Sequence, residues 1–384
     1  MTKKSLVILG STGSIGKQAL EIVSKFPQRF QVLALGAGEN LELLKAQVER
    51  FAPRIISVKD PEKAEQIKKQ IPPQVKVLSG EEGLLELAGL KEADLVLLAL
   101  VGAVGLKPLL RAIENKKTIA LANKEPMVMA GQIIRKRAEE NSAKLIPVDS
   151  EHCAIFQLLE KRAPKEIKKV ILSASGGPFR RRAPGELEEV SPEQALAHPT
   201  WKMGKKISVD SATLMNKALE LIEARWFFNL NPSQLEVVIH PQSIVHSLVE
   251  LKDGSVLAHL SLPDMRIPIA YALFYPQREE LDFPRLNLAE VGKLEFEPAD
   301  FEHYPALKLG FYALKTGGTM PAVMNASNEV GVEAFLSGKI RFNRIVELVE
   351  RVMVEHQAKE AKTLQDIFQA DAWARARTKE LIND

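Results

Sequence analysis

Two carboxylates, a hydroxyl and an imidazole stand together at Asp149, Ser150, Glu151 and His152, between two apolar runs. One interpretation is a helix start, because Asp or Ser caps a helix and Glu suits its first turn. The other is a cation site. If the chain stays extended there, the side chains of Asp149 and Glu151 point the same way and offer the hard oxygen ligands that a divalent cation needs. Two carboxylates seldom complete such a site, so the second interpretation requires a third ligand from elsewhere.

Segment 207–228 is the best source of that ligand. We expect a short strand at its start, then a helix with Ser211 as N-cap. Asn216, Lys217 and Glu220 are three and four residues apart, so they share one helical face. That face is either an exposed polar surface with a Lys–Glu pair, or part of a pocket.

Two other polar runs add a phosphate pocket to the interpretations of this face. Ser175 precedes two glycines, and Asn123, Lys124 and Glu125 follow an apolar run. Hydroxyl, amide and ammonium groups are donors suited to phosphate. These side chains are therefore candidates for the phosphate end of a substrate site.

A glycine-rich turn, Gly10 to Gly16, follows the first apolar run and opens the first helical pattern. Glycines let the backbone approach a pyrophosphate, and a helix N-terminus offers free N–H groups. The spacing G-x-x-G-x-x-G differs from G-x-G-x-x-G, so a plain strand–helix turn remains the alternative. Glu39 follows the second strand. An acidic side chain there favours NAD by bonding a ribose hydroxyl, unless it is simply solvated at the next helix start.

The basic loop from His198 to Lys206 contains Trp201 and Gly204 and is either a lid, at about 195–205, or a surface loop whose tryptophan packs on a neighbour. His240 and His246 are six residues apart on a strand-like run, a poor spacing for a ligand pair. We interpret them as structural or supporting residues.

The elements that must position these groups alternate in the first 149 residues. Short apolar runs at 5–9, 55–58, 93–100 and 117–123 alternate with helical patterns, which predicts a parallel sheet covered on both faces, of the Rossmann type. Residues 150–275 are of mixed α+β character, with a hairpin around Lys252 to Ser255. Residues 276–300 form a predicted linker. Residues 301–384 form a predicted helical bundle.

Composition limits the class of protein. The chain has 384 residues, 46% apolar and 26% charged, with a net charge of +3, which predicts a globular protein of two or three domains without a nucleic-acid partner. The single cysteine, Cys153, excludes an internal disulfide framework. The sequence contains no run of 18 apolar residues, so we expect no membrane span. We expect a cytoplasmic protein.

Several blocks in order resemble 1-deoxy-D-xylulose 5-phosphate reductoisomerases: GSTGSIG, ALANKE, PVDSEH, SASGGPF, the long run HPTWKMGKKISVDSATLMNKALELIEARWFF, HPQSIVHSLVE and NASNEV. The resemblance implies an oxidoreductase that acts on a CH–OH group with NADP. Members of this family rearrange 1-deoxy-D-xylulose 5-phosphate and reduce the product with NADPH to 2-C-methyl-D-erythritol 4-phosphate, in the non-mevalonate isoprenoid pathway. It also implies a homodimer.

The resemblance assigns roles by motif position. The ligands of Mg²⁺ or Mn²⁺ would be Asp149, Glu151 and Glu220. The phosphate end would be held by Ser175, Ser211, Asn216 and Lys217. Substrate contacts would also come from Lys124, Ser150, Glu151, His198, Trp201 and Glu220, with Lys124, Glu151 and His198 catalytic. The cofactor would be lined by Thr12, Gly13, Ser14, Ile15, Gly38, Glu39, Asn40, Asn123, Glu125 and Gly204.

Two residues depart from the family pattern. Glu39 stands where many members have a basic residue near the adenosine 2′-phosphate, which weakens the preference for NADPH. Cys153 replaces another small residue, and we expect it to pack inertly.

Three alternatives remain open. Another nicotinamide-dependent dehydrogenase that acts on a phosphorylated or semialdehyde substrate would need a catalytic cysteine. A metal-dependent lyase or phosphatase would not consume NADPH. A non-enzymatic nucleotide sensor would tolerate Glu220→Gln.

Overall fold

The computed structural model describes residues 3–201 and 203–383. They form two compact units. The first contains residues 1–126, 134–149 and 265–281, and the second contains 127–133, 150–264 and 282–384. Across these described ranges, no helix combines the length and apolarity that a membrane crossing requires.

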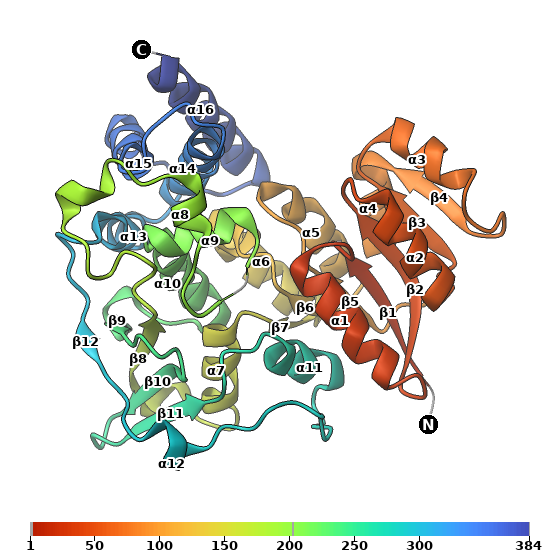
Figure 1. The fold of residues 1–384 in the computed structure, drawn as a ribbon, viewed down its shortest axis with the longest axis horizontal. Helices are drawn as coiled ribbons and strands as arrows, with labels where there is room; N and C mark the ends of the chain where they lie inside the picture. Colours follow the sequence, from red (N-terminus) through yellow and green to blue (C-terminus); the bar gives the residue numbers. More distant parts are fainter. Residues whose placement is uncertain (1–2, 202, 384) are drawn as a thin grey trace. The chain divides into compact units, whose positions relative to one another are not determined.

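The first unit is built on a seven-stranded parallel sheet in the order β4-β3-β2-β1-β5-β6-β7 (Figure 1). The central strands are continuous apolar runs because helices cover them, which confirms the predicted Rossmann-type sheet. The strands are β1 (Lys4–Leu9), β2 (Phe30–Ala37), β3 (Ile55–Val58), β4 (Lys76–Ser79), β5 (Leu95–Leu98), β6 (Thr118–Leu121) and β7 (Lys144–Pro147). The helices are α1 (Ser14–Lys25), α2 (Leu41–Phe51), α3 (Pro61–Lys68), α4 (Gly80–Ala88), α5 (Leu106–Glu114) and α6 (Glu125–Asn141), the last of which runs through both units.

The chain returns to the first unit after residue 264, through α11 (Arg266–Phe274). Phe274 packs on the rings of Phe26 and Phe30 at centroid distances of 5.0 and 4.9 Å. The Lys4 ammonium donates to the carbonyl of Leu273 at 2.8 Å. Segment 150–275 therefore does not stay together, because its last apolar helix covers the sheet of the first unit.

The second unit contains a mixed sheet in the order β11-β10-β8-β9-β12. Its strands are β8 (Ile167–Ala174), β9 (Leu235–Ile239), β10 (Val245–Leu251), β11 (Val256–Leu260) and β12 (Glu297–Pro298). The predicted hairpin is confirmed, since β10 and β11 pair antiparallel. The predicted linker contributes structure of its own, because β12 pairs with β9 and α12 (Leu288–Val291) precedes it.

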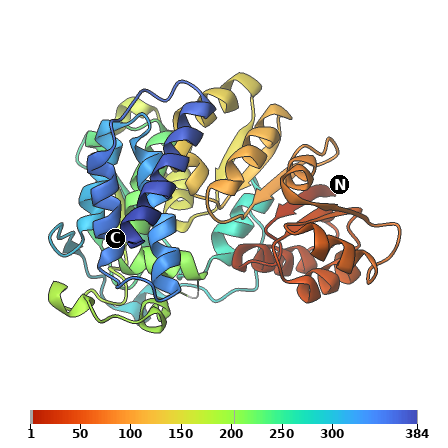
Figure 2. The ribbon, with the colours of Figure 1, turned by 90° about the horizontal axis from the view of Figure 1, so that it is seen from above.

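Helices α13 (Pro305–Thr316), α14 (Met320–Leu336), α15 (Arg344–Glu355) and α16 (Leu364–Asn383) form the end of the described chain. The last three lie side by side in both views (Figure 2). They share one apolar core with α10 (Met215–Phe228) and β8. Helix α13 approaches α10 closely because Gly310 has no side chain: a Cβ there would stand 2.6 Å from that of Ala218. The helical C-terminal region therefore supports the helix that carries Glu220.

The predicted strand at the start of segment 207–228 is wrong. Residues 205–212 form helix α9 (Lys205–Ala212), and Ser211 lies in its last turn instead of capping α10. Lys206 and Asp210 form an ion pair one turn apart at 2.7 Å, and Val209 is fully buried against Phe335 and Ile345 of the C-terminal helices. This tertiary packing overrides the strand preference of the local sequence.

Candidate active site

The glycine turn leads from β1 into α1 and has the geometry that a dinucleotide requires. Gly10 has φ of +93°, and a Cβ on Gly16 would lie 2.3 Å from the Gly10 carbonyl oxygen. Gln47 of α2 donates to the Ser11 carbonyl at 2.9 Å and braces the turn. Thr12 lies in the turn, Gly13 is the N-cap of α1, and Ser14 and Ile15 form its first turn. The helix N-terminus and close backbone approach fit a pyrophosphate.

In dinucleotide-binding folds the end of the second strand lies near the adenosine ribose, and here β2 ends beside Gly38, Glu39 and Asn40. Asn40 caps α2 by accepting from the Leu43 N–H at 3.0 Å, next to Gly38 and Glu39. Glu39 is exposed, and its carboxylate lies 3.6 Å from the ammonium of Lys63 on α3. Glu39 is therefore solvated. Its basic neighbour Lys63 could not be found from the sequence, because it lies on a different element, helix α3.

The residues after β6 are buried. The Asn123 amide donates to the Gly102 carbonyl at 3.2 Å and also to the Glu125 carboxylate. The Lys124 ammonium contacts the Asp149 carboxylate, and both side chains are about nine-tenths buried. Because β6 and β7 are parallel neighbours, their carboxyl ends bring these two charges together.

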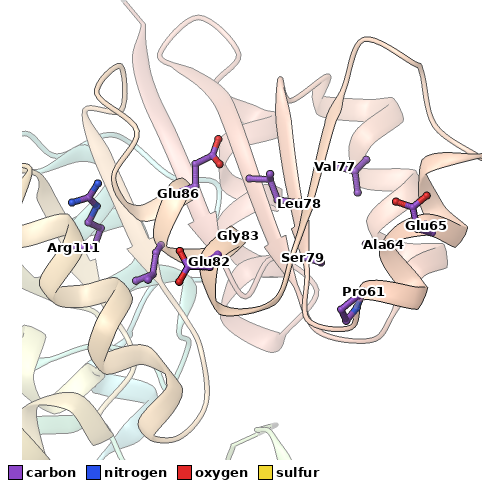
Figure 3. A pocket seen from close by; sticks show the side chains of 11 residues that line it. Pro61, Ala64, Glu65, Val77, Leu78, Ser79, Glu82, Gly83, Glu86 and Arg111 are labelled. Atoms are coloured by element: carbon purple, nitrogen blue, oxygen red, sulfur yellow. The ribbon is translucent and has the colours of Figure 1, made fainter. Parts of the chain in front are cut away.

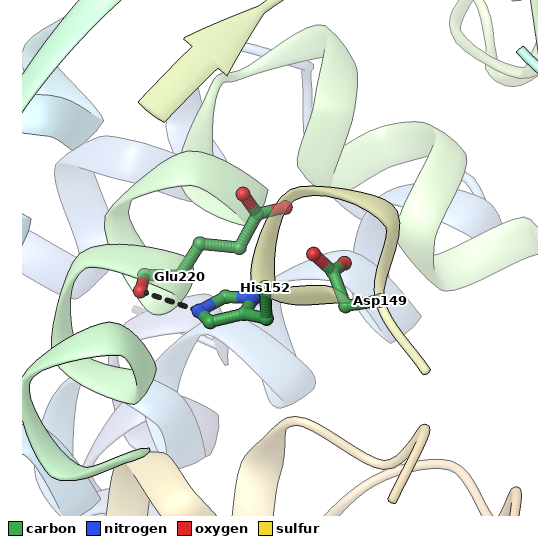
Figure 4. Close-up of side chains that lie close together, drawn as sticks. All are labelled: Asp149, His152 and Glu220. Carbon is green, nitrogen blue, oxygen red and sulfur yellow. Dashed lines mark hydrogen bonds between the residues drawn. The ribbon is translucent and has the colours of Figure 1, made fainter. Parts of the chain in front are cut away.

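Helix α7 (Ser150–Leu159) begins immediately after Asp149. The expectation of an extended chain through Asp149 and Glu151 is therefore wrong: Glu151 already lies in the first helical turn. Helical spacing puts Asp149 and His152, three apart, on one side. Asp149, His152 and Glu220 each offer a ligand atom, and these atoms lie within 4.8 Å of one another (Figure 4).

His152 has other contacts that account for its position. It is fully buried, and its Nε2 lies 3.1 Å from the Glu220 backbone carbonyl, shown as the dashed line in Figure 4. A carbonyl oxygen only accepts, so Nε2 carries the proton. Its Nδ1 lies 3.6 Å from the Glu223 carboxylate. His152 thus ties α7 to α10.

The polar face of α10 is buried, which excludes the interpretation as an exposed surface. Glu220 is 0% and Lys217 4% exposed. Asn216 donates to one Glu220 carboxylate oxygen at 2.5 Å, and Lys217 contacts the other. The Lys217 ammonium also lies 3.8 Å from Glu151 Oε2. The carboxylates of Glu151 and Glu220 are therefore directed toward the same point.

His246 supports Glu151, in agreement with its interpretation as a supporting residue, and Ser247 is a second support that the sequence did not reveal. His246 Nδ1 lies 3.6 Å from Glu151 Oε1, and its Nε2 is 2.9 Å from the Ser261 hydroxyl. Ser247 donates to the Glu151 carbonyl at 3.1 Å. Only the tertiary structure brings β10 to α7, so no sequence spacing could reveal these contacts. His240 is structural: its ring contacts the Glu295 carbonyl at 2.8 Å and the Ile244 N–H at 3.1 Å.

Ser175 and His198 lie together. His198 Nε2 is 3.1 Å from the Ser175 hydroxyl, and Nδ1 accepts from the N–H groups of Thr200 and Trp201 at 3.1 and 3.0 Å. These two donors leave Nδ1 unprotonated and Nε2 as the proton carrier. Trp201 lies 6.3 Å from His246, ring to ring, and Gly204 is the exposed N-cap of α9. Lys202, in the predicted lid, lies outside the described residues.

Burial lowers the pKa of His198 to about 4. Between pH 6.5 and 4 the unfolded chain then binds more protons at this residue than the folded chain, so its contribution to stability is complete above pH 6.5 and is lost on acidification. We expect the melting temperature of His198→Asn, which has no titrating group, to fall less steeply over this range than that of the parent. Parallel curves would contradict this assignment.

A cavity of about 700 Å³ lies elsewhere in the first unit, between α3, β4 and α4 (Figure 3). Glu65, Glu82 and Glu86 face it, with Arg111 at one side. It contains none of the predicted site residues, and its carboxylates do not suit a phosphorylated ligand.

Comparison with known proteins identifies the family. Three family models match: 1-deoxy-D-xylulose 5-phosphate reductoisomerase over residues 6–131, its C-terminal domain over 145–228, and the DXP reductoisomerase C-terminal domain over 260–377. The 1-deoxy-D-xylulose 5-phosphate reductoisomerase of Chlorobaculum tepidum is 50% identical over 99% of this chain and 100% of its own. That of Geobacter metallireducens is 51% identical over 99% of each chain.

Solved structures agree. The reductoisomerase of Zymomonas mobilis in complex with NADPH has a TM-score of 0.92 at 40% identity and covers 99% of each chain. A DOX-P reductoisomerase in complex with NADPH, fosmidomycin and magnesium has a TM-score of 0.94 at 39% identity and covers 99% of this chain and 98% of its own. This chain therefore belongs to the 1-deoxy-D-xylulose 5-phosphate reductoisomerase family, and its function is the NADPH- and divalent-metal-dependent rearrangement and reduction of that sugar phosphate in the non-mevalonate isoprenoid pathway.

Proposed function

We propose that Asp149, Glu151 and Glu220 hold the divalent cation, and that Lys124 and Lys217 compensate their charge. The observation that carries this proposal is the pair of buried lysine contacts: Lys124 with Asp149, and Lys217 between Glu151 and Glu220. Buried carboxylates need a positive counter-charge, and oxygen ligands suit Mg²⁺ and Mn²⁺.

A cation held by these carboxylates would act as a Lewis acid on the oxygen atoms of the substrate. Glu151, next to His246, accepts the hydroxyl proton and returns it after the carbon–carbon bond has been cleaved and re-formed. Lys124 stabilises negative charge on the substrate oxygen. Ser150 contacts the same end of the substrate from the first turn of α7.

The phosphate end is assigned to Ser175, Ser211, Asn216 and Lys217, with His198 orienting the Ser175 hydroxyl. A phosphate held far from the reacting carbons can orient the fragments and supply energy to close the Trp201 loop. The glycine turn from Gly10 to Gly16 would hold NADPH, which would supply the hydride for the reduction.

The choice between Glu151 and His152 as third ligand can be tested directly. We expect Glu151→Gln to weaken Mg²⁺ binding by about 10- to 100-fold and His152→Asn to change it less, because His152 already donates to the Glu220 carbonyl. Mg²⁺ titration of each variant by calorimetry measures this. A larger loss in His152→Asn would assign the ligand to histidine instead.

We assign the 2′-phosphate of NADPH to the neighbourhood of Lys63. Its ammonium offsets the Glu39 carboxylate at the end of β2, where dinucleotide-binding folds read the ribose. Lys63→Ala should weaken binding of 2′,5′-ADP by roughly three- to tenfold and leave 5′-AMP unchanged, while Glu39→Lys should strengthen only the former. Equal changes for both nucleotides would contradict this role.

We further propose a cytoplasmic homodimer that also accepts Mn²⁺. Cys153 is the single cysteine of the sequence and is buried, which fits a reducing compartment. Strand β11 is an edge of its sheet and carries an exposed Val256, a surface suited to a second copy. Sedimentation that gives only the monomer mass would contradict the dimer.

One assay tests the function. Purified protein, 1-deoxy-D-xylulose 5-phosphate and Mg²⁺ should oxidise NADPH, and chelation by EDTA should abolish the reaction. The alternative, a dehydrogenase with a semialdehyde or other phosphorylated substrate, predicts that a thiol reagent inactivates the enzyme. Because Cys153 is only 2% exposed, we expect no inactivation.

A further inference from the structure

Two buried hydrogen bonds connect the C-terminal region to the candidate phosphate residues. The first comes from Tyr304, which precedes α13 and is 5% exposed. Its hydroxyl donates to the Gly176 carbonyl at 2.9 Å. Gly176 directly follows Ser175, so this bond holds the loop that presents the Ser175 hydroxyl.

The second comes from Asn328 of α14, which lies in the block NASNEV, a block with no assigned role in the site. Asn328 is 0% exposed, and its amide donates to Asp210 Oδ1 at 2.8 Å. The other Asp210 oxygen accepts from Lys206 at 2.7 Å, and Asp210 is 2% exposed. Asp210 precedes Ser211, so this bond holds the last turn of α9.

The two held segments also touch each other. Gly177 has φ of +67°, and a Cβ there would lie 2.7 Å from the Ser211 carbonyl oxygen. The Gly177 N–H donates to the Ser175 hydroxyl at 3.2 Å. The Ser175 loop and the end of α9 are therefore packed backbone to backbone, and each is tied to a different C-terminal element.

We infer that Tyr304 and Asn328 are positioning residues that set the distance between Ser175 and Ser211 and so tune affinity for the phosphate group. This inference rests on the proposed assignment of those two serines. It gives the C-terminal helices a part in substrate recognition, although Tyr304 and Asn328 act only through Gly176 and Asp210.

Tyr304→Phe removes only the hydroxyl, and Asn328→Asp places a second carboxylate against Asp210. Each should raise the KM for the sugar phosphate and the Ki of inorganic phosphate by roughly three- to tenfold, with the KM for NADPH unchanged. The double variant Asp210→Asn/Asn328→Asp exchanges the two side chains. An amide at position 210 then donates to a single carboxylate at position 328. It should recover most of the loss caused by Asn328→Asp.

Controls separate positioning from general stability. Asn325→Ala removes another fully buried amide of α14, whose partner Glu329 lies on the same helix, and Tyr312→Phe alters an exposed tyrosine of α13. Both should leave the Ki of phosphate unchanged whatever their melting temperatures. Ser211→Ala tests the underlying assignment: an unchanged Ki would overturn both the phosphate site and this inference. If the Ki of phosphate rose in Ser211→Ala but stayed unchanged in Tyr304→Phe and Asn328→Asp, the phosphate site would stand and only this inference would be overturned.

Discussion

Glu220→Gln should lower kcat/KM for the sugar phosphate by about 10²- to 10³-fold, because it removes a proposed charged ligand of the cation that the reaction requires. Glu220 is fully buried and neutralises Lys217, and its carboxylate is a proposed cation ligand. Glutamine keeps the size of the side chain but loses the charge. We therefore expect weaker Mg²⁺ binding together with a lower melting temperature, measured by titration calorimetry and thermal denaturation.

Glu329→Gln is the matched control for this substitution. Glu329 is a mostly buried carboxylate in α14 that pairs with Arg375 at 2.7 Å, away from the proposed cation ligands. It should lose stability and keep Mg²⁺ affinity. If Glu220→Gln bound Mg²⁺ as tightly as the parent, Glu220 would not be a ligand and the proposed cation site would have to be abandoned.

Lys124→Met should lower kcat by about 10²- to 10³-fold and leave the KM for NADPH nearly unchanged, as expected when a preorganised positive group that stabilises oxygen charge is removed. Methionine keeps the apolar stem, so packing is largely retained. The ammonium contacts Asp149 in a nearly buried pair. Steady-state kinetics with saturating Mg²⁺ measures the effect.

Lys117→Met provides a control at the other end of the same strand. Lys117 stands before β6 and Lys124 after it, and both are 7% exposed. The Lys117 ammonium donates to the carbonyls of Lys91 and Ala93 at 2.7 and 2.8 Å. We expect this variant to lose stability and keep its kcat. Comparable kcat losses in both variants would show that Lys124 acts through the fold and not on the substrate.

Local sequence patterns were sufficient to predict the parallel sheet in the first 149 residues. Apolar runs that alternate with helical patterns can satisfy their backbone groups as covered parallel strands, and β1, β3, β5 and β6 lie within or next to the predicted runs. The hairpin of β10 and β11 was predicted for a similar reason, since a short polar turn joins two apolar runs.

Local patterns failed where long-range packing outweighs propensity. The β-branched Ile207 and Val209 indicate a strand, but Val209 is buried against the C-terminal helices and the segment is helical. Helix α11 lies in the first unit, more than 100 residues from the strands that it covers, because its apolar side chains complete that core. Neither outcome depends on spacing along the chain.

The candidate site shows the same division. The sequence by itself determined which residues are candidates by their chemistry: a glycine turn for a dinucleotide, carboxylates at Asp149, Glu151 and Glu220 for a cation, and donors for a phosphate. Only the tertiary structure decided that Lys217 joins Glu151 to Glu220, that His246 faces Glu151, and that Tyr304 and Asn328 reach the phosphate residues. Residue type follows from local chemistry, whereas proximity between distant segments follows from burial of the apolar faces that carry them.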